Sequence, residues 1–189
     1  MNDQTANSSE SVVLAIDLQP SFLAAIPNAD EVLRRSAFLL DVARFLEVPV
    51  LATTQVAPRM GGLDREIGAR LGAKDILDKQ SFSCAGNEEF LKRLERSNQV
   101  QIVVCGIETH ICVCQTTLDL LASEFDVFVV ADAVSARSRE AHEIGLRRMS
   151  DSGAFITHSE SVAYEWLEAS DHPRFREVLE LVKSSFATV

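Results

Sequence analysis

The sequence lacks three features, and each absence excludes a class of protein. No apolar run is long enough to cross a bilayer, because stretches such as 125–134 are interrupted by charge and fall short of the roughly 20 residues required. There is no basic excess: the net charge is −10, whereas nucleic-acid binding requires a clustered basic face. The first ten residues show neither a basic start nor an apolar run, so we expect no signal peptide. We therefore expect no membrane partner and no nucleic-acid partner.

Cysteine is also scarce, with residues at positions 84, 105, 112 and 114. Without a secretion signal, this usage favours reduced thiols in a cytoplasmic protein over a disulfide framework. The cysteines form no Cys-x-x-Cys pair, which is the spacing typical of structural zinc sites. We expect no metal and no cofactor.

Apolar runs alternate with amphipathic stretches along the chain. The apolar runs predict strands at 12–18, 50–54, 100–107, 126–131 and 153–157, with a weaker strand at 73–78. Helical spacing of apolar residues predicts helices near 29–47, 87–97, 110–123, 138–151, 160–169 and 174–185. Because parallel strands need crossovers of this length, the pattern predicts an α/β fold. We expect a three-layer α/β/α sandwich with a mostly parallel, Rossmann-like sheet of about six strands.

We expect one domain over residues 11–189, since a chain of 189 residues falls within the size range of a single α/β domain. The polar residues 1–10 predict a disordered N-terminal tail. A dinucleotide-binding Rossmann protein is not expected, because the first strand is followed by DLQPSF and not by a Gly-rich turn.

Chemically useful side chains follow three of the predicted strands. Asp17 lies at the end of the first, Gln55 follows the second, and Glu108 to Cys112 follow the strand at 100–107. In an open parallel sheet, reacting groups collect beyond the carboxyl ends of strands where the strand order reverses. These residues would share one crevice if the first strand and the 100–107 strand are neighbours.

Cys112 lies in the stretch CGIETHICVC, where a strand turns into the first turn of a helix. Backbone N–H groups and the helix dipole favour thiolate at such a position and lower the thiol pKa from its usual value near 8.5. A cysteine considered alone is more often a small buried apolar residue, and Cys105 and Cys114 fit that interpretation.

Asp17 interrupts an apolar strand, where an unpaired carboxylate is costly. It could be a base that removes a thiol proton, or an aspartate that caps a helix or ends a strand. Lys79 could be the cation that pairs with it, although a loop lysine considered alone is usually a solvated surface charge.

Three segments carry a resemblance to a known family. AIDLQPSF at 15–22, DKQSFS at 78–83 and GIETHICV at 106–113, in this order, resemble the isochorismatase-like cysteine hydrolases, in particular the short isochorismatase-domain proteins. The similarity extends from residue 12 to residue 185.

The resemblance implies roles for individual residues. Cys112 would be the nucleophile, Asp17 the acid/base and Lys79 the supporting cation of a catalytic triad. The resemblance also implies a cis peptide between Ile107 and Glu108, with the N–H groups of Glu108 and Cys112 forming an oxyanion hole. The implied reaction is hydrolysis of a small amide-, ureide- or imide-like substrate through a thioester intermediate, in a homo-oligomer.

The sequence departs from one branch of the superfamily. Nicotinamidases carry an aspartate and two histidines after the second strand, and these bind a metal. The stretch TTQVAPRMGG has neither residue type, so metal-dependent nicotinamidase activity is not expected.

Residues that flank the proposed crevice are candidates for the substrate pocket. They are Gln19, Phe22, Gln55, Phe82 and His110. Phe22 and Phe82 could equally belong to the core, and His110 could be a partly exposed residue at the start of a helix. Asp132 and Arg137 also follow a strand end, where a structural pairing or a subunit contact is the simpler interpretation.

Two other functions stay open from the sequence. The chain could be an oligomeric interaction protein of the same fold with a vestigial triad. It could also be a thiol redox protein, although Cys112 and Cys114 project about 200° apart on a helix and so make a poor resolving pair.

Overall fold

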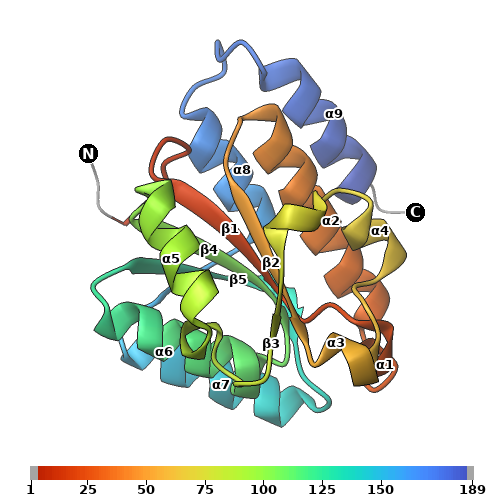
Figure 1. Cartoon of the computed structure of the whole chain (residues 1–189). Helices are drawn as coiled ribbons and strands as arrows, with labels where there is room; N and C mark the ends of the chain where they lie inside the picture. Colours follow the sequence, from red (N-terminus) through yellow and green to blue (C-terminus); the bar gives the residue numbers. More distant parts are fainter. Residues whose placement is uncertain (1–3, 187–189) are drawn as a thin grey trace.

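The computed structural model describes residues 4–186 and contains one six-stranded parallel sheet with helices on both faces (Figure 1). The strands are β1 (Ser11–Ile16), β2 (Val50–Gln55), β3 (Ile76–Lys79), β4 (Gln101–Ile107), β5 (Asp126–Ser135) and β6 (Phe155–Thr157). Their order in the sheet is β3-β2-β1-β4-β5-β6, and every neighbouring pair is parallel. The predicted three-layer α/β/α sandwich is confirmed.

The helices divide between the two faces of the sheet (Figure 1). One face carries α2 (Ala29–Phe45), α8 (Ser159–Leu167) and α9 (Phe175–Phe186), and the other carries α5 (Glu88–Ser97), α6 (Cys114–Ala122) and α7 (Arg139–Asp151). Short helices occupy the loops: α1 (Pro20–Leu23), α3 (Ala57–Met60) and α4 (Arg65–Gly68). None of the helices in residues 4–186 combines the length and the apolar character needed to cross a membrane.

Burial on both faces of the sheet explains why the sequences of the central strands are continuous apolar runs. All six residues of β1 are buried, and successive side chains enter opposite cores. Val13 and Ala15 join the core beneath α2 and α8, whereas Leu14 and Ile16 join the core beneath α5 and α6. A strand covered on both faces has no solvent-facing side, so its sequence does not alternate between apolar and polar residues.

Two segments differ from the sequence-based expectation. The weak strand expected at 73–78 begins later: Ala73–Asp75 form a 3₁₀ turn, and β3 then runs to Lys79. Part of the expected tail is ordered, because Ala6 is buried and its N–H donates to Glu165 Oε2 at 2.8 Å. The N–H of Asn7 donates to Gln101 Oε1 at 2.7 Å. Residues 1–3 lie outside the described range.

Gly106 allows β4 to approach β1 at the end nearest Asp17. Its φ is +117°, and a Cβ at this position would lie 2.1 Å from the carbonyl oxygen of Ile16. Gly153 also has a positive φ, of +105°, but has no atom within 4 Å of the position of an added Cβ. The two glycines therefore share a strained conformation and differ in the space around them.

We expect Gly106→Ala to destabilise the protein more than Gly153→Ala. Both alanines are strained by positive φ, at a cost of about 1–3 kcal/mol. Only the alanine at 106 also collides with backbone, which adds roughly 2 kcal/mol. Urea denaturation of both variants measures the difference, and equal losses of unfolding free energy would refute the steric argument.

Candidate active site

The polar residues predicted to share a crevice come from adjacent strands of the sheet. Asp17 directly follows β1, Gln55 ends β2 and Lys79 ends β3, while Cys112 lies in the π-helical turn Thr109–Val113 that follows β4. β1 lies between β2 and β4, so the carboxyl ends of these strands meet at one edge of the sheet. The structure therefore brings Asp17, Lys79 and Cys112 together.

Asp17 is a buried carboxylate held on both oxygens. It is 2% exposed and has a left-handed backbone, with φ of 52°, which is uncommon outside glycine. Lys79 Nζ donates to Oδ2 at 2.7 Å, and Thr53 Oγ1 donates to Oδ1 at 2.8 Å. Because each oxygen has a fixed partner, the orientation of the carboxylate is set by β2 and β3. Sequence analysis missed the role of Thr53, which reads as an ordinary strand residue.

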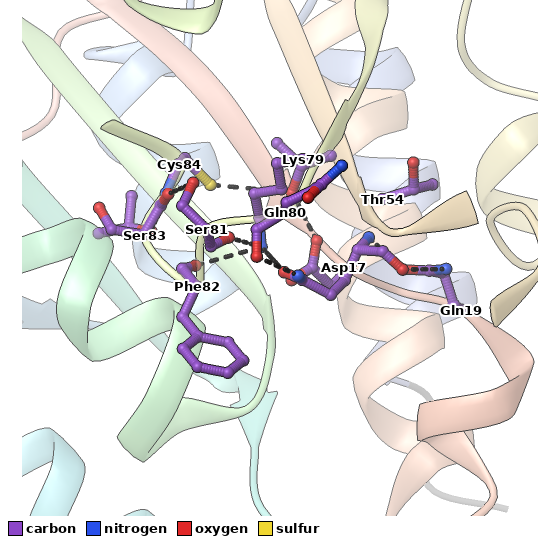
Figure 2. A network of polar contacts seen from close by, with 12 residues as sticks. Asp17, Gln19, Thr54, Lys79, Gln80, Ser81, Phe82, Ser83 and Cys84 are labelled. Atoms are coloured by element: carbon purple, nitrogen blue, oxygen red, sulfur yellow. Dashed lines mark hydrogen bonds and ion pairs between the residues drawn. The ribbon is translucent and has the colours of Figure 1, made fainter. Parts of the chain in front are cut away.

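Lys79 is more constrained than a surface lysine would be. Its ammonium donates to Asp17, to Gln55 Oε1 at 2.6 Å, and to the carbonyl oxygens of Phe82 at 3.1 Å and Ser81 at 3.3 Å. Figure 2 shows Asp17 and the loop after β3 converging on this group. An ammonium has three N–H donors, and here four acceptors surround it. Lys79 is therefore fully occupied in holding Asp17 and the loop.

Cys112 is a mostly buried thiol beside this pair. Burial, first, and then the nearby charge of Asp17 raise its pKa to about 12, and a hydrogen bond to the Asp17 carboxylate acts in the same direction. Lys79 opposes these effects without overcoming them. The expectation that this pKa is lowered is therefore wrong, because burial and the charge of Asp17 raise it. The resting group is therefore a thiol with a hydrogen bond to Asp17.

A small cavity of about 90 Å³ opens beside the thiol. Its lining residues are Asp17, Phe22, Gln55, Phe82, Ile107, Glu108, Ile111 and Cys112. Phe82 is 56% exposed and forms part of the rim. Three of the expected pocket residues, Phe22, Gln55 and Phe82, do line the cavity. The isoleucines were missed, because apolar residues next to a motif look like core residues in a sequence.

Gln19 and His110 are not among the lining residues. Gln19 is fully buried and acts as a brace: its amide nitrogen donates to the carbonyl oxygen of Gly61 at 2.6 Å, and its oxygen accepts from the N–H of Gln55 at 2.6 Å. The backbone of His110 packs on α7, where a Cβ added to Gly145 would lie 3.1 Å from His110 Cα. Gln19 therefore positions segments of the site, and neither residue is part of the cavity lining.

Glu108 connects the cavity to the loop after β5. The peptide bond between Ile107 and Glu108 is cis, the isomer that the resemblance implies. Glu108 Oε2 accepts hydrogen bonds from the N–H of Arg137 at 3.1 Å and from its Nε at 3.0 Å. Asp132 lies in a separate cluster, where it accepts from the N–H of Ser159 at 2.8 Å and so holds the start of α8. Arg137 thus supports the site, whereas Asp132 has a structural pairing.

Within the described residues, no group of three or more His, Cys, Asp or Glu side chains is arranged to hold a metal ion. The chemistry visible at this edge is that of a thiol, a carboxylate and an ammonium. A carboxylate in contact with a thiol beside a cavity can serve as the base for a nucleophilic sulfur.

The isochorismatase domain model matches residues 11–161. This chain belongs to the isochorismatase family. Isochorismatase domain-containing protein 2A of Mus musculus is 36% identical over 174 residues, which are 92% of this chain and 82% of the mouse protein. The predicted membership, including the short-domain subgroup, is confirmed. Membership of the isochorismatase family supports a hydrolase-type function.

Solved structures of similar proteins extend the comparison. The structure of MAR1 ribonuclease from Caenorhabditis elegans has a TM-score of 0.89 and 34% identity, covering 94% of this chain and 92% of that one. YcaC from Pseudomonas aeruginosa, solved with hexane-2,5-diol and covalent acrylamide, has a TM-score of 0.89 and 25% identity over 100% of both chains. The isochorismatase fold thus extends over nearly the whole chain.

We expect Asp17→Asn to lower the pKa of the Cys112 thiol. The substitution removes the negative charge and the hydrogen-bond acceptor that raise this pKa, and it leaves the ammonium of Lys79 to stabilise the thiolate. The thiol should ionise at least ~1 pH unit lower than in the wild type. Thiolate absorbance at 240 nm measures the midpoint, with Cys112→Ser in each background as the blank. An unchanged or higher midpoint would contradict the proposed contact.

We expect Thr53→Val to destabilise the protein more than Thr54→Val. Thr53 donates to the buried Asp17, whereas Thr54 Oγ1 donates at 2.9 Å to Asp78, whose carboxylate can be hydrated instead. Loss of a hydrogen bond to a buried charge costs about 1.5–3 kcal/mol. The loss at Asp78 costs less, because water can replace the Thr54 hydroxyl at an exposed carboxylate. Chemical denaturation of the two variants gives the comparison, and the reverse order would argue against the role assigned to Thr53.

Proposed function

We propose that this protein is a cysteine hydrolase for a small amide-, ureide- or imide-like substrate, with Cys112 as nucleophile, Asp17 as acid/base and Lys79 as the supporting cation. The observation that carries the proposal is the Asp17 carboxylate, fixed by Lys79 and Thr53 and in contact with the Cys112 thiol. The cavity beside the thiol gives a substrate access to both groups.

The first half of the reaction forms a thioester. Because burial raises the pKa of the thiol to about 12, Cys112 attacks the substrate carbonyl as Asp17 removes its proton. The protonated Asp17 then gives this proton to the departing nitrogen, the C–N bond breaks, and an amine or ammonia leaves. The acyl group remains on Cys112.

The second half restores the enzyme. Asp17 removes a proton from water, the resulting hydroxide attacks the thioester carbonyl, and the C–S bond breaks as sulfur recovers the proton. The products are a carboxylic acid and the free thiol. Throughout both halves, Lys79 keeps the carboxylate oriented through the contacts described above.

We further propose that the backbone N–H groups of Glu108 and Cys112 form the oxyanion hole. Both residues line the cavity, and a negative oxygen that develops there during attack would need donors of this kind. A single oxyanion-hole donor typically contributes on the order of 3 kcal/mol to lowering the barrier.

The comparisons bear on this proposal in two ways. In the YcaC structure, acrylamide is covalently bound to that protein. This supports the choice of small uncharged amides as probes here. The ribonuclease named among the similar structures makes RNA a second candidate substrate. A net charge of −10 disfavours RNA, because phosphate backbones are repelled by an acidic surface.

The two non-hydrolytic functions receive less support. A vestigial site would not need to keep Asp17 bound on both oxygens beside a thiol. A redox function needs a second thiol that an oxidant can reach, but Cys84 and Cys105 are fully buried and neither lines the cavity. The cytoplasmic location and the homo-oligomer stay predictions.

We expect Cys112→Ala to abolish turnover of any substrate found in a panel of small amides, ureides, imides and RNA. Removal of a nucleophile lowers kcat by at least ~1,000-fold. Cys114→Ala is the matched control, since Cys114 is a buried cysteine two positions further along and does not line the cavity. Release of ammonia or amine measures turnover of the carbonyl compounds, and release of nucleotides measures that of RNA. Hydroxylamine trapping detects the acyl group on Cys112. Full turnover by Cys112→Ala would eliminate the mechanism.

A further inference from the structure

The cations near the cavity are already engaged. Among the described residues that line the cavity, none is a lysine, an arginine or a histidine. Lys79 lies behind Asp17 with its side chain fully buried and its donors occupied. Arg137 pairs with Glu108 and is 60% exposed at its side chain, so it faces solvent more than the cavity. A negatively charged ligand would find no free countercharge in the lining.

The lining carries negative charge instead. Asp17 and Glu108 both contribute to the cavity. The Asp17 charge is balanced by Lys79, whereas Glu108 is bound to Arg137 through one oxygen, Oε2. Gln55 adds no charge, and one of the two N–H groups of its side-chain amide already donates to the carbonyl oxygen of Gln80 at 2.8 Å. A carboxylate placed here would lose its hydration and would lie beside a like charge, both of which oppose binding.

The rest of the wall is apolar and the space is small. Phe22, Phe82, Ile107 and Ile111 supply the apolar surface around about 90 Å³. Such a cavity accommodates a compact group with an uncharged carbonyl directed at Cys112. The lining has no cationic side chain to hold a negatively charged substituent, and its two carboxylates oppose one.

We propose that the site accepts small uncharged carbonyl compounds and rejects those that carry a carboxylate, the dianionic isochorismate among them. This inference rests on the proposed function and specifies its substrate class. The rejection arises from Glu108 and from the absence of a free cation in the described lining. Size and charge together restrict the substrate to compact neutral amides, ureides or imides.

Two alkylating reagents of nearly equal size test the charge rule. Iodoacetamide and iodoacetate both form an S–C bond to Cys112 as iodide leaves, and the thiol proton passes to Asp17 or solvent. They differ only in carrying a neutral amide or a carboxylate. Mass spectrometry of the Cys112 peptide gives each rate at pH 7.5. The ratio of the two rates is divided by the same ratio for N-acetylcysteine, which removes the intrinsic difference between the reagents.

We expect the normalised ratio to favour iodoacetamide by roughly tenfold or more. Glu108→Gln should reduce this preference, because it removes the like charge and frees Arg137. Glu143→Gln is the matched control, since Glu143 lies on α7, pairs with Arg139 and does not line the cavity. It should leave the preference unchanged.

The outcomes separate this inference from the proposed function. A normalised ratio near one, with Cys112 alkylated by both reagents, overturns the charge rule and leaves the nucleophile in place. A preference that survives Glu108→Gln in full overturns the assignment to Glu108. Failure of both reagents to modify Cys112, while N-acetylcysteine reacts, counts against the proposed nucleophile itself and removes the basis of the inference.

Discussion

The ion pair between Asp17 and Lys79 is the interaction on which the site depends. Both groups are almost fully buried, and a buried charge is tolerated only when its partner and its hydrogen bonds are in place. Asp17 follows the central strand and Lys79 ends β3, two strands away in the sheet, so the pair forms only when β1, β2 and β3 are correctly registered. Thr53 and Gln55, on the strand between them, supply the remaining contacts.

The ion pair also determines the state of the sulfur. Burial and the nearby charge of Asp17 raise the pKa of the thiol, so the site does not store a reactive thiolate. Instead, the Asp17 carboxylate lies where it can remove the thiol proton during attack on a substrate. A nucleophile formed only during attack leaves no standing thiolate to be oxidised between turnovers, and this suits a buried cysteine whose cavity is small.

Much of this arrangement could be predicted from sequence, because it follows from local patterns. The alternation of buried strands and helices predicts the layers, and the resemblance carried by three segments predicts which side chains meet. The direction in which a side chain points, and the residues that surround it, were harder to predict from sequence. Gln19 and His110 lie beside motif residues yet do not face the cavity, since adjacency in sequence does not fix where a side chain points.

The pKa of Cys112 shows the same limit. The helix start is visible in the sequence, whereas the burial that outweighs it depends on residues from several elements. Lys79 was read as a loop residue because ILDK is short and mixed in polarity, and only its pairing with β2 makes it a strand. The order at Ala6 and Asn7 likewise comes from contacts with Glu165 and Gln101, far away in sequence.

The position of Lys79 on β3 affects the order in which the site and the rest of the fold are lost on heating. β3 is one of the two edge strands, is four residues long, and in the described sheet has β2 as its only strand partner. Edge segments with few contacts open at lower free energy than the centre of a fold. Fraying of β3 would withdraw the ammonium from Asp17 while the central strands and their helices stay folded. Heat inactivation would then precede the loss of secondary structure, and cooling would restore the site without refolding the domain.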